Sequence, residues 1–492
     1  MANKEKLNVV WFCTDQQRYD TIHSLGNPYI KTPNIDKLVD EGAAFTRAYT
    51  QSPVCTPSRS SFLTGRYPRT TKAFYNGNDN YSGEEKLVTK LLADAGYTCG
   101  LTGKLHLSAA QGRMEKRTDD GYCFMRWSHH PHDDWENKEN DYQNWLKAKG
   151  IKWTDIYGGK CTSLSQWPPV INENFSGKEV GVPAEYHQTT WCVEEAINFM
   201  EQSKNNPWLV SINVFDPHPP LDPPQEYKDR LNVENMPLPL WQEGELDGKP
   251  SHQRRDYVQG GQDGATDSII GMSDADKQEA VRDYYAQIEL IDDQLGRLMN
   301  YLEKSGQKDN TVIIYMSDHG EMNGDHGLYW KGAYFYEQLV HVPLIISCPS
   351  RFISGVRCDA LVELVDIAPT LMAMNGLEVP GYMQGKSLLP ILTGAASPHH
   401  FKDAIYCEFY HALAGAHEDI YATMYFDGRY KLVSYCNSEE GELYDLQEDP
   451  NEYLNRWDDA GYCQLKNELI AKNFSQAVMN NMDFSMVQKY SF

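Results

Sequence analysis

Residues 7–16 read Leu7-Asn8-Val9-Val10-Trp11-Phe12-Cys13-Thr14-Asp15-Gln16. The hydrophobic, β-branched and aromatic side chains through Cys13 predict a buried strand, and polar groups follow it at once. The same arrangement recurs where Asp216-Pro217-His218 follows residues 208–215 and where Asp318-His319 follows residues 311–316. Helical patterns alternate with these runs, which is typical of a sheet covered on both faces by helices. We therefore predict an α/β fold.

Residue types that are common at helix ends predict the positions of several helices. Three are predicted over residues 33–41, 85–95 and 273–304. Pro33 at the first position and a glycine directly after each of the first two are typical end signals. Ser273 and Asp276 would cap the third helix.

The pattern changes past residue 396. Short alternating strands are predicted at residues 421–426 and 429–435, and a helix near residues 467–479. We therefore divide the chain into a large domain of residues 1–396 and a smaller α+β domain of residues 397–492.

Composition limits the class of protein. The chain has 492 residues, 41% hydrophobic and 23% charged, which is an ordinary globular composition. A formal net charge of -24 should repel nucleic acid and anionic membranes, and no run approaches the roughly 18 apolar residues of a membrane helix. Eleven cysteines without a Cys-x-x-Cys pair indicate neither a disulfide framework nor a zinc knuckle, and they fit a reducing compartment. The start lacks a secretory pattern, so we expect a cytoplasmic protein, or a periplasmic or secreted one if a signal was removed.

Polar residues at the ends of two predicted strands suggest a metal site. In open α/β sheets ligands bind beyond the carboxyl ends of the strands, where Asp15, Gln16, Asp318 and His319 would lie. Two carboxylates, an amide oxygen and an imidazole suit one divalent cation, and the oxygen-rich set favours Ca²⁺ or Mg²⁺. Singly, Asp15 or Asp318 would more often cap a turn, but their shared position after separate strands favours the metal.

A second cluster is Cys55-Thr56-Pro57-Ser58-Arg59, followed by Ser60-Ser61-Phe62-Leu63-Thr64-Gly65. Pro57 fixes the backbone ahead of a short helix that Gly65 ends, which places Cys55 at a helix N-terminus. Backbone amides and the helix dipole favour an anion there. The planar guanidinium of Arg59 adds a permanent positive charge with hydrogen-bond donors in a fixed geometry. The alternative for Cys55 is a buried structural thiol.

Other candidates are weaker when taken alone. In Gly103-Lys104-Leu105-His106, an extended backbone would point Lys104 and His106 to one face, where both could serve an anion. His218 could instead be a rigid loop residue, and Lys331 plain surface charge. Residues 129–134, His-His-Pro-His-Asp-Asp, more often form a solvated loop than a metal site.

At residues 55–65 the chain resembles the type I sulfatase family, whose signature is Cys-x-Pro-x-Arg followed by Leu-Thr-Gly. Further likenesses span nearly the whole chain: Gly103-Lys104-Leu105-His106-Leu107, Pro217-His218, Ser317-Asp318-His319-Gly320, residues 364–371, residues 442–446 and Asp449-Pro450. The resemblance implies the alkaline phosphatase superfamily fold, with a large doubly wound mixed sheet flanked by helices and a small C-terminal antiparallel sheet packed with a helix.

The resemblance also implies a mechanism. A maturase, formylglycine-generating or radical-SAM, oxidises Cys55 to formylglycine, and its hydrate presents two hydroxyls. One hydroxyl, ionised at the metal, attacks sulfur, and loss of the proton of the second then expels sulfate. The matching motifs assign a role to each residue. The metal would be held by Asp15, Gln16, Cys55, Asp318 and His319. Arg59 and Lys104 would stabilise the hydrate, His106 would be the base, and His218 with Lys331 would bind sulfate and protonate the leaving oxygen.

Three positions depart from the family pattern. Gln16 stands where many members carry a second Asp, His319 where many carry Asn, and Leu105 where Trp is common. The first two weaken the negative charge around the metal, but both residues still offer a ligand atom. Ca²⁺ is expected from the oxygen-rich ligand set, with Mg²⁺ or Mn²⁺ as alternatives. The rival activity is phosphonate or phosphate ester hydrolysis, and a binding protein without catalysis is a further alternative.

The substrate is not named by these motifs. Polar, proline-rich residues 117–187 and 217–271 are predicted to form long loops that shape a pocket. Tyr and Trp between Tyr122 and Trp191 could stack on a sugar ring, so a sulfated mono- or oligosaccharide is the first expectation. Choline sulfate and aryl sulfates stay open as alternatives.

Overall fold

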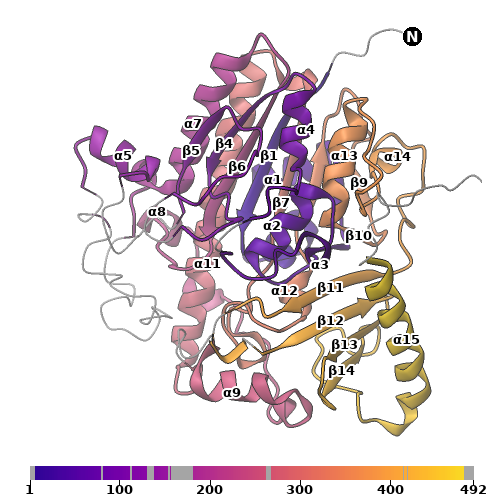
Figure 1. Cartoon of the computed structure of the whole chain (residues 1–492). Coiled ribbons are helices and arrows are strands. Elements are labelled where there is room, and N and C mark those ends of the chain that lie inside the picture. Colours follow the sequence, from indigo (N-terminus) through magenta and orange to yellow (C-terminus); the bar gives the residue numbers. More distant parts are fainter. Residues whose placement is uncertain are drawn as a thin grey trace, which may run out of the picture.

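The computed structural model describes residues 6–480 except 79–80, 111–113, 130–137, 153–155, 157–180, 262–267, 414 and 418. Figure 1 shows a large sheet flanked by helices, with a small sheet and a long helix at its lower right. The large sheet has eight strands: β1 (Asn8–Asp15), β2 (Ala43–Phe45), β4 (Thr98–Gly103), β5 (Phe124–Trp127), β6 (Trp208–Pro217), β7 (Thr311–Ser317), β8 (Leu344–Ser347) and β9 (Val356–Cys358).

The strands of the large sheet lie in the order β5-β4-β6-β1-β7-β8-β2-β9. Strands β5, β4, β6, β1 and β7 run parallel to one another, whereas β8 is antiparallel to both of its neighbours, β7 and β2. The predicted mixed sheet is thereby confirmed. Because β4, β6, β1 and β7 are adjacent and parallel, the residues that follow them meet at one edge of the sheet.

Helices cover both faces of this sheet (Figure 1). Along β1, Val9 and Trp11 pack in one hydrophobic core with α2, α4 and α13, and Val10 and Phe12 pack in the other with α1, α7 and α11. This alternation is what a strand buried on both faces requires. The helices are α1 (Pro33–Glu41), α2 (Cys55–Thr64), α3 (Pro68–Thr71), α4 (Val88–Asp94), α5 (Asp141–Ala148), α7 (Gln188–Ser203), α8 (Gln225–Lys228), α9 (Ser251–Gln259), α11 (Asp274–Lys304), α12 (Glu337–Val340), α13 (Ile367–Met374), α14 (Leu389–Leu392) and α15 (Cys463–Asn480).

The C-terminal part is a four-stranded antiparallel sheet of β11 (Ile405–Tyr410), β12 (Tyr421–Phe426), β13 (Tyr430–Tyr435) and β14 (Gly441–Asp445). One face packs against α15 through Leu432, Leu443 and Leu469. The other face of the small sheet is turned toward the large sheet. Its side chains share a hydrophobic core with Val54, the residue before α2. The small sheet therefore supports the start of α2. A further pair, β3 (Ala48–Tyr49) and β10 (Val362–Glu363), is parallel.

Most predicted elements are confirmed, and the errors have local causes. The capping pair at the start of α11 is present, with each side chain bonded to the other residue's backbone. The helix predicted from residue 85 begins only at Val88, because Leu87 is extended and the Glu85 carboxylate pairs with Arg66 at 3.0 Å. Strand β5 and helix α9 lie in regions that were predicted to be loops, so that prediction was wrong there. Within the described residues, none of the helices has the length and apolar character needed to cross a membrane.

Candidate active site

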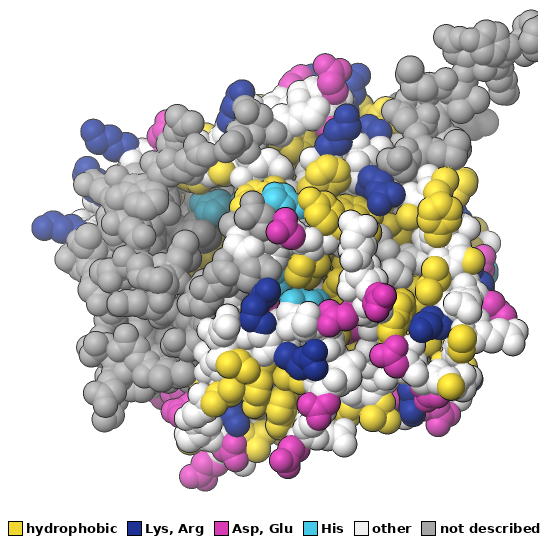
Figure 2. Space-filling model, turned by 60° about the horizontal axis from the view of Figure 1, so that its bottom comes forward, with side chains coloured by type: hydrophobic (Ala, Val, Ile, Leu, Met, Phe, Trp, Pro, Cys, Tyr) yellow, Lys and Arg dark blue, Asp and Glu magenta, His cyan; other side chains and the backbone are white. Residues whose placement is uncertain are grey.

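The site lies where the carboxyl ends of four parallel strands meet the N-terminus of α2. Asp15 ends β1, Asp318 follows β7, His218 follows β6 and Lys104 follows β4. Figure 2 turns the lower end of Figure 1 toward the reader, and histidine side chains surface there among hydrophobic groups. The sheet topology thus gathers residues that are hundreds of positions apart in the sequence.

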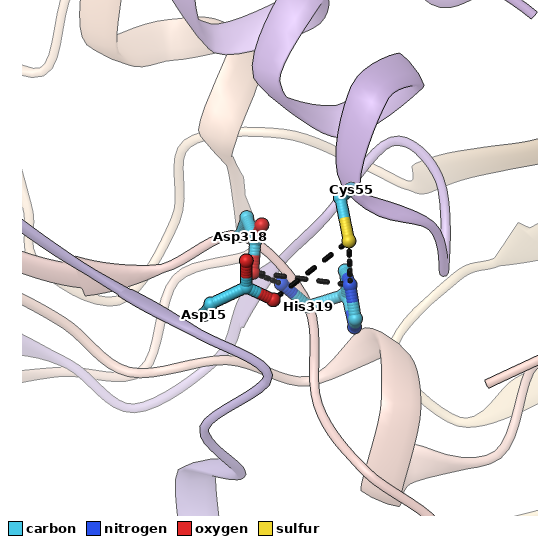
Figure 3. Close-up of side chains that lie close together, drawn as sticks. All are labelled: Asp15, Cys55, Asp318 and His319. Carbon is cyan, nitrogen blue, oxygen red and sulfur yellow. Dashed lines mark hydrogen bonds and ion pairs between the residues drawn. The ribbon is translucent and has the colours of Figure 1, made fainter. Parts of the chain in front are cut away.

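Four buried side chains form the centre of the site (Figure 3). Asp15, Cys55, Asp318 and His319 each offer one ligand atom, and these atoms lie within 4.8 Å of one another. Cys55 Sγ is 3.1 Å from His319 Nε2 and 3.7 Å from Asp15 Oδ1. His319 Nδ1 lies 2.8 Å from the Gly320 carbonyl oxygen, and this contact turns Nε2 toward the other three groups.

Two cations hold the carboxylates of this group in place. Arg59 Nε donates to Asp318 Oδ2 at 2.8 Å, and another of its nitrogens donates to Asp15 Oδ2 at 3.2 Å. Lys104 Nζ donates to Asp15 Oδ2 and lies 3.9 Å from Cys55 Sγ. All four side chains in these pairs are almost completely buried, so the pairs are poorly screened by solvent. Each carboxylate therefore keeps its Oδ1 atom on the side of Cys55 and His319.

The charges shift the pKa values of the central groups. Burial would raise the pKa of Asp15, but the charges of Lys104 and Arg59 outweigh it and hold that pKa well below its ordinary value. Burial and Asp15 would raise the pKa of the Cys55 thiol, but Lys104, Lys331 and His319 bring it below its ordinary value. Burial would lower the pKa of His319, but Asp318 and Cys55 raise it. The two shifts are opposite in direction, and Cys55 Sγ and His319 Nε2 are joined by a hydrogen bond, so one proton lies between them.

Gln16 lies beside this group, with its side chain engaged elsewhere. Its backbone N–H donates to Asp318 Oδ1 at 3.1 Å, in a left-handed conformation with φ of 73°. Its Nε2 donates to Glu321, and its Oε1 accepts from Lys331 Nζ at 2.7 Å. A role for Gln16 as a metal ligand therefore stays a prediction. Glu321, which sequence reasoning missed, fixes the orientation of the amide.

His218 and Lys331 form a hydrogen-bonded pair. Lys331 Nζ lies 2.8 Å from His218 Nε2, and both side chains are more than nine-tenths buried. His218 Nδ1 lies 2.6 Å from the Pro219 carbonyl oxygen, which leaves Nε2 as the acceptor for the ammonium group. Burial and Lys331 hold the pKa of His218 well below its ordinary value. The two side chains are thus joined by a buried hydrogen bond, and the interpretation of Lys331 as plain surface charge is wrong.

His106 is placed by its backbone rather than by an extended strand. Strand β4 ends at Gly103 and His106 has φ of 57°, so the extended geometry that would point Lys104 and His106 to one face is absent. Burial and Lys104 hold the pKa of His106 well below its ordinary value, which keeps the imidazole neutral. Its Nδ1 has no hydrogen-bond partner among the described residues, and its ring meets that of His129 at 4.6 Å. A neutral imidazole with a free nitrogen is chemically able to accept a proton.

Glu115 holds this segment and was not singled out from the sequence. Its buried carboxylate accepts from the backbone N–H groups of His106, Leu107 and Ser108 at 2.7, 2.8 and 3.1 Å. It also accepts from the indole of Trp127 at 3.2 Å. Nothing in the local sequence signals this role, since Glu115 belongs to a polar loop.

A second group of buried polar side chains surrounds Asp216, two residues before His218. Asp216 approaches His187 Nδ1 at 3.3 Å, accepts from Thr189 and accepts from Gln287 Nε2 at 3.3 Å. Burial raises the pKa of Asp216 to about 6. Asp216 lies near the end of β6, and the sequence marked it as one of the polar residues that follow a hydrophobic run, without assigning it a role. Of the His-rich residues 129–134, those from 130 onward lie outside the described residues.

The central group fits a divalent cation. Its atoms are carboxylate oxygens and an imidazole nitrogen, with residue 55 as a further donor. Carboxylate oxygens suit Ca²⁺, Mg²⁺ or Mn²⁺, and an imidazole is acceptable to the last. The contact of His319 Nδ1 with a carbonyl oxygen is the support that metal-bound histidines usually have.

Comparisons with known proteins agree with this geometry. A family model described as Sulfatase matches residues 7–377, and one described as N-sulphoglucosamine sulphohydrolase, C-terminal, matches residues 324–478. An arylsulfatase of Clostridium perfringens is 30% identical over 463 residues, which cover 92% of this chain and 90% of that protein. An N-acetylglucosamine-6-O-sulfatase of Bacteroides thetaiotaomicron is 26% identical over 492 residues, covering 94% and 85%. A phosphonate monoester hydrolase of Agrobacterium radiobacter has a similar fold, with a TM-score of 0.81, 24% identity and coverage of 99% and 98%.

Proposed function

Since this chain belongs to the sulfatase family and is a sulfuric ester hydrolase, we propose that it releases sulfate from a carbohydrate sulfate ester, using formylglycine made from Cys55 and one divalent cation. Its fold is that of the alkaline phosphatase superfamily. The observation that carries the proposal is the position of Cys55, which begins α2 and lies in one buried group with Asp15, Asp318 and His319.

Asp15, Asp318 and His319 would hold the cation together with residue 55, and Gln16 would join them if its amide oxygen left Lys331. When bound, the cation lowers the pKa of a hydroxyl group on the matured residue 55 and offsets negative charge on the group being transferred. Arg59 and Lys104 lie against Asp15 and Asp318, so they fix the carboxylates and leave positive charge beside residue 55.

The pair of Lys331 and His218 would act on the other side of the sulfate group. Because the two nitrogens are hydrogen-bonded at 2.8 Å, one would bind a sulfate oxygen while the other supplies a proton to the departing alcohol. A sugar hydroxyl is a poor leaving group, so this proton matters most for a carbohydrate ester. His106, neutral and held by Glu115, would take the proton of the remaining hydroxyl of residue 55 when sulfate is expelled.

A carbohydrate substrate is supported by the relatives and by the site. One relative is an N-acetylglucosamine-6-O-sulfatase, and its likeness extends over 94% of this chain. Trp330 precedes Lys331 in the chain, and its ring centroid lies 6.2 Å from that of His218, so an aromatic side chain lies beside the proposed sulfate site. Aromatic faces of this kind bind the apolar side of a sugar ring. The maturase would be a formylglycine-generating or radical-SAM enzyme.

A phosphonate monoester is the second candidate substrate. The observation that favours it is the pair of buried cations, Arg59 and Lys104, which lie beside residue 55 and would stabilise charge on a phosphoryl group as well as on a sulfuryl group. A phosphonate monoester and a sulfate monoester each carry one negative charge at neutral pH, so cations placed for one group suit the other as well. The fold neighbour that hydrolyses phosphonate monoesters shows that this fold can house the reaction.

The experiment is a comparison of substrates on the matured protein. N-acetylglucosamine 6-sulfate, other sulfated sugars, p-nitrophenyl sulfate and a phosphonate monoester would be assayed for release of sulfate or phosphonate, with Cys55→Ala as the control. We expect the sugar sulfates to have the highest kcat/KM, and Cys55→Ala to release nothing. Turnover of aryl sulfates alone would reject the carbohydrate, and a higher kcat/KM for the phosphonate would replace the sulfate ester by the second candidate.

A further inference from the structure

We propose that the unmodified chain, in which residue 55 is still a cysteine, is a Zn²⁺-binding protein, and that maturation of Cys55 switches the site away from zinc. The first half concerns only the chain as it is translated and folded. The second half rests on the proposed function, because it takes Cys55 to be the residue that is oxidised.

The positions of the four ligand atoms suit a tetrahedral ion (Figure 3). Cys55 Sγ lies 3.1 Å from His319 Nε2 and 3.7 Å from Asp15 Oδ1, and His319 Nε2 lies 3.9 Å from Asp318 Oδ1. Zinc–sulfur bonds of about 2.3 Å and zinc–nitrogen or zinc–oxygen bonds of about 2.0 Å at tetrahedral angles place neighbouring ligand atoms about 3.3–3.6 Å apart. The observed separations lie on both sides of this value, so small side-chain movements would complete the site.

The surrounding contacts already orient the ligand atoms. His319 Nδ1 lies against the Gly320 carbonyl oxygen at 2.8 Å, so Nε2 is the nitrogen that faces Cys55. Arg59 and Lys104 occupy Oδ2 of Asp15, which leaves Oδ1 toward the thiol. Asp318 Oδ1 accepts backbone N–H bonds from Gln16 and His319 and is the most engaged of the four. Cys55, His319 and Asp15 are therefore the strongest ligands.

The chemistry of the ligands distinguishes the two forms of the chain. A thiolate and an imidazole prefer Zn²⁺ to Ca²⁺ or Mg²⁺, which prefer oxygen ligands. Cys55 and His319 hold one proton between Sγ and Nε2; zinc would form bonds to both atoms, and that proton would pass to solvent. Formylglycine carries oxygen in place of sulfur, so the matured site would lose its one soft ligand. His319 matters as much, because the Asn that many family members carry would offer an amide oxygen instead.

The test uses the full-length chain produced without a maturase, with Cys55 confirmed as unmodified by mass spectrometry. The reduced, metal-free protein is titrated with Co²⁺, and thiolate-to-cobalt absorption is followed while Zn²⁺ displaces the cobalt. We expect one equivalent of Zn²⁺ to abolish the absorption. Cys55→Ala and His319→Asn should each weaken zinc binding at least about 100-fold, as loss of a first ligand exceeds the usual effect of losing its support. Cys436→Ala, at an exposed cysteine outside the site, should bind zinc like the parent.

The matured protein provides the comparison that needs no substitution. It should show no thiolate absorption with Co²⁺ and should bind Zn²⁺ at least about 100-fold more weakly than the unmodified chain. Zinc affinity equal in the unmodified, matured and Cys55→Ala proteins would overturn the proposal, and so would zinc binding without thiolate absorption. Sulfate release is not measured in these titrations, so a failed proposal for zinc leaves the proposed function untouched.

Discussion

Glu115 provides a direct test of how the site is supported. Its carboxylate accepts four hydrogen bonds, three from the backbone at residues 106–108 and one from the Trp127 indole. His106 is held there at φ of 57°, a conformation that is unfavourable for a residue with a side chain. Glu115→Gln keeps the size of the side chain but replaces one acceptor oxygen by an NH₂ group. That NH₂ group would face two N–H donors.

The magnitude follows from the number of bonds lost. Each bond to a charged acceptor contributes about 1.5–3 kcal/mol, so the loss of two would weaken the local structure by about 3–6 kcal/mol. Amide hydrogen exchange at residues 106–108, followed by mass spectrometry of the peptide, should become at least about 100-fold faster. Because the His106 ring would no longer be fixed, kcat for sulfate release should fall about 100-fold while KM changes little.

A matched control is Glu201→Gln on the exposed end of α7, where the carboxylate meets Lys204 in solvent. This variant should leave both the exchange of residues 106–108 and kcat unchanged. If Glu115→Gln retains the parent's exchange rates and kcat, the carboxylate does not hold His106, and the reasoning about this segment is refuted.

Three further predictions test the chemistry and the electrostatics. Lys331→Ala should lower kcat for a sugar sulfate about 10²–10⁴-fold but affect p-nitrophenyl sulfate much less, because only the poor leaving group needs a proton; equal losses would contradict that role. Burial raises the pKa of Glu408 from 4.5 to about 7, so its contribution to the free energy of unfolding is complete below pH 4.5 and is lost as pH rises through about 7. Urea unfolding between pH 5 and 8 should therefore show a loss of about 3 kcal/mol that Glu408→Gln lacks, and identical pH profiles would reject the assignment. Removal of divalent ions with a chelator should abolish sulfate release and Ca²⁺, Mg²⁺ or Mn²⁺ should restore it, whereas full activity in protein shown to be metal-free would exclude a metal role.

The gathering of the site could be predicted from the sequence because it depends on the sheet. Asp15 ends β1 and Asp318 directly follows β7, each after a clear hydrophobic run, and the carboxyl ends of adjacent parallel strands share one edge. Cys55 was correctly placed at a helix N-terminus, although α2 begins at Cys55 itself and Pro57 lies in its first turn. These features follow from local patterns and one topological rule.

The contacts that orient the site could not be predicted in the same way. Gln16 meets Lys331, which is 315 residues away in the sequence, and Glu321, which is 305 residues away. Only the packed structure brings such partners together. Glu115 accepts hydrogen bonds from backbone amides, and because nearly every residue type carries such an amide, no sequence pattern marks these donors. For His106, the end of β4 and a positive φ replaced the extended geometry that a strand would have given.

The central claim is that Cys55 becomes the catalytic group of a sulfatase. The measurement is peptide mass spectrometry across Cys55 on protein produced together with a maturase, combined with a sulfate-release assay on the same sample. We predict a mass loss of about 18 Da at Cys55, as conversion of a thiol to an aldehyde nucleophile precursor requires, and sulfate release in proportion to the modified fraction. Full sulfate release from protein whose Cys55 is entirely unmodified would contradict the account.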